Sequence, residues 1–278
     1  MTVLGAYPSI RCSRMGRLVI ARLSAVILLV LGSLSLASCD AMRDMMGAPH
    51  RYIVAPDPAF LADDENAASV TDAAIAESAA VIQRRLAGVG IRVTRVTLQG
   101  RHRITIDTDG PVNRDDLAAV IAPNGRLEVR AIDQSVSTQD LLANRAPPGS
   151  EILPLSASLH QVLEMTAVRR LGGVSRGRVA NAYVSRNEQS AEPVVKVELD
   201  QRGTEQMARF SEERVGEPAA FIVDDMVLST AIIAEPITSG RIELVGNLTQ
   251  QRAGQLAAIL QGGELTIPFT IVAEAELD

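Results

Sequence analysis

Residues 216–227 read GEPAAFIVDDMV, and this stretch decides the fold of the second half of the chain. Residues 219–223 form an apolar run, Asp224 and Asp225 are turn formers, and an apolar segment resumes at Met226. Apolar segments separated by such a two-residue connection predict a β-hairpin, because the connection matches the twist of paired strands.

Regular elements are predicted on both sides of this hairpin. The aliphatic run at residues 194–199 predicts a strand. Asp200 and Thr249 stand at the starts of two amphipathic segments, where their side chains can cap a helix. The expected order is therefore a strand at 194–199, a helix at 200–216, the hairpin, a helix at 249–263 and a final strand at 265–273.

The first half of the chain predicts a second, smaller set of elements. Ile75, Ala79, Ile82 and Leu86 align on one helical face behind the cap residue Thr71. The pattern then gives a hairpin over residues 91–106, a helix capped by Asn113 and a strand at 127–132. Helix, strand, strand, helix, strand is the order of a small sheet with helices on one face.

Composition shifts divide the chain into lobes. We expect a flexible tether at residues 39–69, rich in small, polar and proline residues, and a connector at 134–165 that includes Pro147, Pro148 and Pro154. The predicted fold class is α+β, with two small lobes of antiparallel or mixed sheet and helices packed on one face. The lobes are expected at residues 70–133 and 166–278.

The N-terminal segment has the pattern of an export signal. Four arginines precede an apolar run at residues 23–36, which is shorter than the about 20 residues that span a bilayer. Ala37, Ser38 and Cys39 resemble the end of a bacterial lipoprotein signal, so residues 1–38 are expected to be removed and Cys39 to be lipidated. The alternative is an ordinary secretory signal with an incidental cysteine, and Met15 is an alternative start.

Charge and composition exclude several classes of function. The chain has 27 Lys and Arg against 33 Asp and Glu, and removal of the four signal arginines takes its net charge from −6 to −10. Such a surface repels phosphate backbones, so no nucleic-acid partner is expected. Trp is absent and aromatic residues make up 3%, so the core is expected to be aliphatic. Beyond Cys39 the chain has no cysteine for a disulfide or a metal.

Several blocks of the second half occur in a distinctive order. They are residues 193–199 (PVVKVEL), 216–223 (GEPAAFIV), 224–227 (DDMV), 235–237 (EPI), 246–249 (GNLT) and 260–265 (LQGGEL). These blocks resemble the periplasmic P1 head region of SecD, an export-accessory membrane protein that works with SecF beside the translocation channel. A weaker likeness to the P1 base covers residues 70–132, with residues 82–86 (IQRRL) and 127–130 (LEVR).

The resemblance also marks departures from the family. The family continues into transmembrane helices that use the proton gradient, whereas this sequence ends at Asp278. A lipid anchor is expected to replace the first membrane helix. The family has Asp-Gly at the hairpin, so Asp225 must adopt the positive φ that glycine adopts at less cost.

No catalytic, metal or cofactor site is predicted from the sequence. Asp115 and Asp116 are expected to complement the dipole of a helix, and 63–65 to be a solvated acidic patch. His50, His102 and His160 lack metal-ligand spacing. Gly172, Gly173 and Gly177 predict a flexible connector, and the chain is not expected to be an enzyme.

A binding surface is the more specific prediction. An exposed aliphatic surface suits unfolded segments, since hydrophobic contact is not directional. The candidates are Met226, Val227, Ile232, Ile233 and Ile237, with the alternative that each is a core residue. An edge beside residues 194–199 is a second candidate, as an acceptor of an added strand.

These observations predict a lipid-anchored accessory to protein export on the periplasmic side of the envelope. Asp40 follows the lipidated cysteine, which resembles the inner-membrane retention signal of enteric lipoproteins. The expected partners are the membrane, through lipid at Cys39, and secreted polypeptides or Sec translocase components. The alternative is a structural envelope lipoprotein that kept the fold without the export role.

Overall fold

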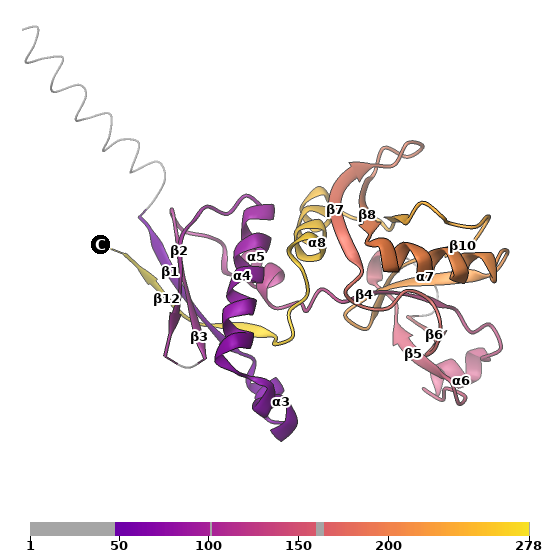
Figure 1. The fold of residues 1–278 in the computed structure, drawn as a ribbon, viewed down its shortest axis with the longest axis horizontal. Helices are drawn as coiled ribbons and strands as arrows, with labels where there is room; N and C mark the ends of the chain where they lie inside the picture. Colours follow the sequence, from indigo (N-terminus) through magenta and orange to yellow (C-terminus); the bar gives the residue numbers. More distant parts are fainter. Residues whose placement is uncertain (1–47, 101, 160–163, 278) are drawn as a thin grey trace, which may run out of the picture. The chain divides into compact units, whose positions relative to one another are not determined.

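The chain folds into two lobes, which we call the base lobe and the head lobe. The base lobe is built on a four-stranded antiparallel sheet in the order β12-β1-β3-β2. The computed structural model describes residues 48–100, 102–159 and 164–277. Helices α4 and α5 pack on one face of the sheet, as Figure 1 shows. The elements of this lobe are β1 His50–Pro56, α2 Pro58–Leu61, α3 Asp64–Ser69, α4 Asp72–Gly88, β2 Val93–Gln99, β3 Arg103–Thr108, α5 Arg114–Ile121 and β12 Phe269–Glu276.

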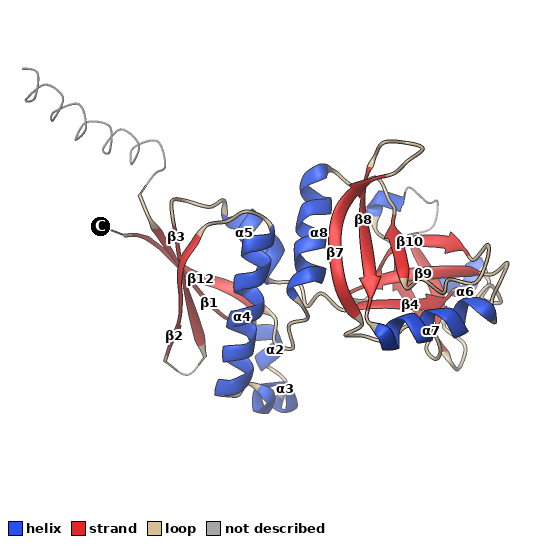
Figure 2. Cartoon of the chain, turned by 45° about the horizontal axis from the view of Figure 1, so that its top comes forward, coloured by secondary structure: helices blue, strands red, loops and turns tan. Residues whose placement is uncertain are grey.

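The head lobe contains the other sheets. One has the strand order β10-β9-β4, as Figure 2 shows. A second has the order β11-β8-β7, and a two-stranded sheet pairs β5 with β6. Its elements are β4 Leu127–Ala131, α6 Thr138–Leu142, β5 Ser150–Pro154, the 3-10 turn η1 Ala157–Leu159, β6 Met165–Arg169, β7 Val179–Arg186, β8 Pro193–Leu199, α7 Gln201–Glu212, β9 Pro218–Val223, β10 Met226–Ile232, β11 Arg241–Leu244 and α8 Gln250–Gly262.

Aliphatic side chains make up most of both cores. In the base lobe, Ile75, Ile82 and Leu86 of α4 are buried against Ile104 and other strand residues, as the helical periodicity predicted. In the head lobe, Met207 and Phe210 of α7 share a core with Val129, Phe221 and residues of α8. Helix α8 also packs against α4, and it therefore lies where the two cores meet.

The predicted helix caps are present. The side chains of Thr71, Asn113, Asp200 and Thr249 each accept a hydrogen bond from a main-chain N–H in the first turn of the helix that follows. The β9-β10 hairpin is also present, with Val223 opposite Met226. Local sequence signals thus placed these element starts correctly.

Several boundaries differ from the sequence expectation. The range 39–69, expected to be a tether, contains β1, and Asp63 caps α3, so that expectation is wrong from residue 50 onward. Strand β4 was assigned to the first lobe but pairs with β9 of the head. Strand β12 was assigned to the second lobe but pairs with β1 of the base. The range 134–165, expected to be a connector, contains α6, β5 and η1.

No helix among the described residues has the length and apolar content that a membrane crossing requires.

Candidate functional site

The turn of the β9-β10 hairpin is held by its first aspartate. Asp224 and Asp225 have φ values of 51° and 62°, as the positive-φ prediction required. The Asp224 carboxylate accepts hydrogen bonds from the main-chain N–H groups of Gly125 and Arg126, both at 2.9 Å. The turn is therefore fixed to the segment that leads from α5 into β4.

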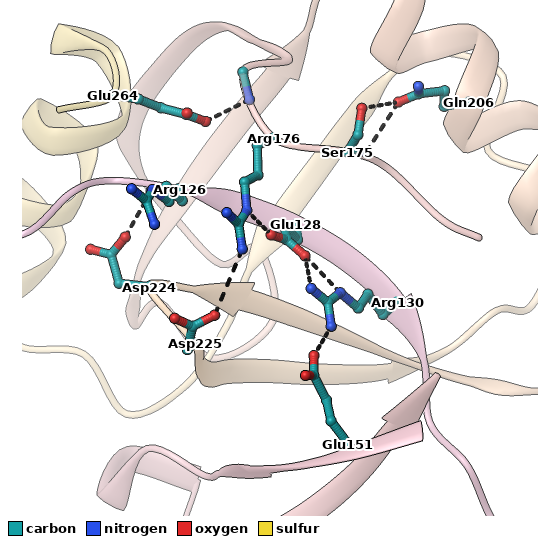
Figure 3. Close-up of polar contacts among 11 residues, drawn as sticks. Arg126, Glu128, Arg130, Glu151, Ser175, Arg176, Gln206, Asp224, Asp225 and Glu264 are labelled. Atoms are coloured by element: carbon teal, nitrogen blue, oxygen red, sulfur yellow. Dashed lines mark hydrogen bonds and ion pairs between the residues drawn. The ribbon is translucent and has the colours of Figure 1, made fainter. Parts of the chain in front are cut away.

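A chain of alternating charges lies beside this turn (Figure 3). Arg130 of β4 bonds both Glu128 and Glu151, and Arg176 bonds Glu128 from the other side. Arg176 also lies 4.0 Å from the carboxylate of Asp225. The two arginine side chains balance the negative charges of Glu128 and Glu151. The cluster therefore leaves no buried charge uncompensated.

Glu128 is the buried member of this cluster. Burial alone would raise the pKa of its carboxyl group, but hydrogen bonds from Arg176 and Arg130 outweigh burial and hold that pKa below the usual value. Glu128 is therefore ionised at neutral pH and acts as an acceptor. This state fits a structural anchor rather than a proton donor.

The segment of residues 170–178, which we call the strap, runs along the outer edge of β4. Val174 exchanges main-chain hydrogen bonds with Val129, at 3.0 and 3.2 Å. At Gly173 a Cβ atom would lie 1.8 Å from the carbonyl oxygen of Val129. Gly173 permits this close approach of two backbones, so the prediction of a flexible connector is wrong for Gly173.

An apolar cleft of about 720 Å³ opens beside the hairpin. Met226 and Leu228 form one wall, and Leu248 from the loop before α8 and Leu256 from the middle of that helix contribute to the lining. Arg252 is the charged residue of the lining. The remaining lining residues are Ala119, Pro123, Ser156, Ala157, Val223, Asn247, Thr249, Gln255 and Ile259.

A smaller hollow of about 190 Å³ lies under α7. Ile232, Ile233 and Ile237 line it together with Met207 and Phe210 of the helix. The hairpin therefore presents apolar residues to a hollow near each end of β10.

The structure separates the five predicted binding residues. Met226 is 41% exposed and Ile232 is 70% exposed, whereas Ile237 is half-buried against the head core. Val227 and Ile233 are buried, so for these two the core alternative is correct. Cys39, the predicted lipidation site, lies outside the described residues.

The predicted acceptor edge at residues 194–199 is closed. These residues form β8, which pairs with β7 on one side and β11 on the other. Asp115 and Asp116 lie in the first turn of α5, as predicted. Among residues 48–100, 102–159 and 164–277, no group of three His, Cys, Asp or Glu side chains is placed to hold a metal ion.

Sequence reasoning missed most of the cleft. Leu248 and Leu256 stand beside Met226 only because the chain returns through α8 after the hairpin, and no local pattern reports such a contact. The one sequence signal near Leu256 is the amphipathic segment behind Thr249, which predicted the helix at 249–263 that contains this residue.

Comparisons with known proteins agree with the predicted resemblance. The family model described as the P1 head subdomain of SecDF matches residues 155–267. Protein translocase subunit SecD of Syntrophobacter fumaroxidans is 27% identical over 209 residues, which cover 74% of this chain and 39% of that protein. SecD of Desulfurispirillum indicum is 28% identical over 208 residues, covering 73% and 40%. The chain thus spans about two fifths of the length of these relatives.

Solved structures show the same fold. A SecDF crystal structure in a super-membrane-facing form aligns with a TM-score of 0.61 and 19% identity, covering 82% of this chain and 30% of that one. A structure from work on SecDF as a membrane component that enhances protein export aligns with a TM-score of 0.57 and 19% identity, covering 80% and 98%. The predicted α+β class and the P1 likeness are confirmed.

Proposed function

We propose that this chain, which carries a SecD-type P1 domain, is a lipid-anchored, non-enzymatic accessory to protein export that binds non-native polypeptide or a translocase component. The relatives are named as translocase subunits, and the range 155–267 matched by the family model includes the hairpin and all the lining residues of the cleft except Ala119 and Pro123. The proposed site of action is the periplasmic face of the membrane, with the inner membrane favoured by Asp40.

The observation that carries the proposal is the apolar cleft beside Met226. A side chain such as Met226 adapts to ligands of different shape, because it is unbranched and polarizable. Aliphatic walls bind apolar segments with little dependence on their sequence. A translocating chain offers many such segments in turn.

Photo-crosslinking in cells tests this function. A photoreactive residue at Met226 should capture secreted precursors or Sec components, whereas the same probe at Leu142 of α6 should not. Leu142 is a suitable control because it is 71% exposed and does not line the cleft. Equal capture at both positions, or none at Met226, contradicts the proposal.

The same crosslinks separate export from a purely structural role. A block of secretion should reduce the capture of precursors at Met226 within minutes. Crosslinks to one fixed partner that persist unchanged after the block would favour a structural envelope lipoprotein.

The anchor is tested by acyl labelling. The Cys39→Ala variant should lose labelling by a palmitate analogue and appear in the soluble fraction. Labelling that persists in this variant would remove the lipid anchor from the proposal.

A further inference from the structure

Strand β10 is an edge strand without the charged residues that the other described edge strands carry. Exposed edges invite pairing with other chains, and proteins block them with charges, prolines, bulges or covering segments. Among the strands that the structure describes at sheet edges, β2, β4, β5, β6, β7, β11 and β12 each contain at least one charged residue. Strand β10 reads MVLSTAI, which contains neither a charge nor a proline.

The hydrogen-bond pattern shows which groups of β10 face outward. Ile233 donates to the carbonyl oxygen of Glu217 at 3.0 Å and accepts from the N–H of Gly216 at 2.7 Å, so its main chain faces the β9 side. Successive residues of an antiparallel strand alternate, and therefore Ile232 and Thr230 direct their N–H and C=O groups to the outer edge.

Only one end of this outer edge is covered by residues that the structure describes. Ser156 donates to the carbonyl oxygen of Val227 at 2.8 Å, and η1 follows beside the strand. Within the described ranges no main-chain hydrogen bond reaches the outer edge at residues 230–232. Ile232 is 70% exposed there. A β-bulge between Val227 and Ser229 further separates the covered end from the open end.

We propose that the outer edge of β10 at residues 230–232 pairs through its main chain with an extended segment of non-native polypeptide. Main-chain pairing accepts many sequences, which suits the varied chains of the proposed function on which this inference rests. The preferred segment is uncharged where it pairs and basic beside it, because the acidic residues Asp225 and Glu235 flank the strand and are exposed.

Charge also argues against a second copy of this chain as the occupant. Antiparallel pairing of two β10 edges centred on Thr230 would place Asp225 of each copy near Glu235 of the other. Like charges placed opposite each other in a sheet are destabilising. A peptide with lysines at its ends has the complementary charge.

A capped peptide with lysine at each end and alternating valine and threonine between them tests the inference on the full chain in detergent. The peptide should slow amide hydrogen exchange at Thr230 and Ile232 at least tenfold. It should leave Ala231 unchanged, because Ala231 lies opposite Ala219 and its main chain already faces β9. The inference would be overturned if exchange slowed equally at the amides of Thr230, Ala231 and Ile232, or if it did not slow at all.

Blocked variants provide the second readout. A peptide with N-methyl groups on alternate residues of its pairing edge should bind at least tenfold more weakly than the parent peptide. Thr230→Pro removes an outward N–H, whereas Thr230→Val keeps it. The proline variant should therefore bind the parent peptide at least tenfold more weakly, and the valine variant should bind it as the unchanged chain does. If Thr230→Pro does not fold, the N-methyl peptide and the exchange pattern still decide.

The outcomes separate this inference from the proposed function. Capture of precursors at Met226 without protection at Thr230 and Ile232 would reject edge pairing alone. Absence of capture at Met226 would reject the proposed function. Slower exchange at Thr230 that grows with protein concentration in the absence of peptide would show that a second copy is the occupant, and would also overturn the inference.

Discussion

Arg85 of α4 donates from Nε and Nη2 to the carbonyl oxygen of Gly263, at 3.2 and 2.6 Å, although the two residues are 178 positions apart. The same guanidinium bonds the carbonyl oxygens of Val120, Pro123 and Asn124. Pro123 and Asn124 lie on one of the two segments that connect the base and head lobes and Gly263 lies on the other, whereas Val120 lies in the last turn of α5. Burial lowers the pKa of Arg85 to about 10, so it remains charged at neutral pH.

Arg85→Met should therefore destabilise the whole domain. The change would leave several buried carbonyl groups without a donor, and we expect a loss of about 3 kcal/mol or more in the free energy of unfolding. Urea denaturation measures it. Arg84→Met is the control, because the exposed Arg84 makes a single bond to the Gly262 carbonyl, and it should cost about 1 kcal/mol or less. Equal losses in the two variants would contradict this role of Arg85.

The predictable part of the fold is the local part. Thr71, Asn113, Asp200 and Thr249 were recognised as caps because a capping side chain bonds an N–H two or three residues away. Pairings between distant segments were not recognised. Strand β1 meets β12 more than 200 residues later, and no local pattern reports that partner.

The candidate site shows the same limit. Met226 was found because it follows a turn that the sequence predicts. The burial of Val227 was not, because it involves Leu155, which shares a core cluster with Val227 and is far from it in the sequence. The alternation of buried Tyr52 and Val54 in β1 was a usable strand signal. The prolines around it led to the tether prediction instead.

Glycine substitutions at the two adjacent aspartates of the hairpin turn should change the stability of the protein in opposite directions. Asp225 is exposed and adopts φ 62°, so Asp225→Gly relieves an unfavourable backbone conformation and should stabilise the protein by about 0.5–1 kcal/mol. Asp224→Gly removes the acceptor of two main-chain hydrogen bonds and should destabilise it by about 1–2 kcal/mol. Thermal unfolding measured for both variants checks the signs. If both variants unfolded at a higher temperature than the parent, the two hydrogen bonds that Asp224 accepts would contribute nothing to stability.

Alanine substitutions at the neighbouring glycines Gly172 and Gly173 of the strap should have very different costs in stability. Gly173→Ala forces a Cβ atom into the Val129 carbonyl, and we expect a cost of about 3 kcal/mol or detachment of the strap. Gly172→Ala meets only an Arg214 nitrogen at 4.0 Å and should cost about 1 kcal/mol from its positive φ. Proteolysis of residues 170–178 in the two variants would reveal detachment. A strap that stays protected in a fully stable Gly173→Ala variant would refute the packing argument.

Stability should fall in acid, because ion-paired carboxyl groups must be protonated. Hydrogen bonding to Arg51 holds the pKa of Asp107 below its ordinary value of 3.8, and the pKa values of Glu128, Asp133 and Asp200 are lowered as well. A lowered pKa in the folded state gives stability that is complete above the unfolded pKa and is lost as pH drops through the folded one. We therefore expect constant stability from pH 7 to about 5 and a loss below about 4.

Asp107→Asn tests the assignment of this acid loss. Asp107 is buried beside Arg51, and its Oδ1 lies 2.7 Å from Nε of that residue. The variant should be less stable at pH 7 and should lose less stability on acidification, so that the two denaturation curves converge near pH 2. Asp109→Asn is the control, since Asp109 forms a more exposed ion pair with Arg92 at 3.4 Å. An Asp107 variant whose pH profile stays parallel to that of the parent would show that this ion pair does not contribute to the acid transition.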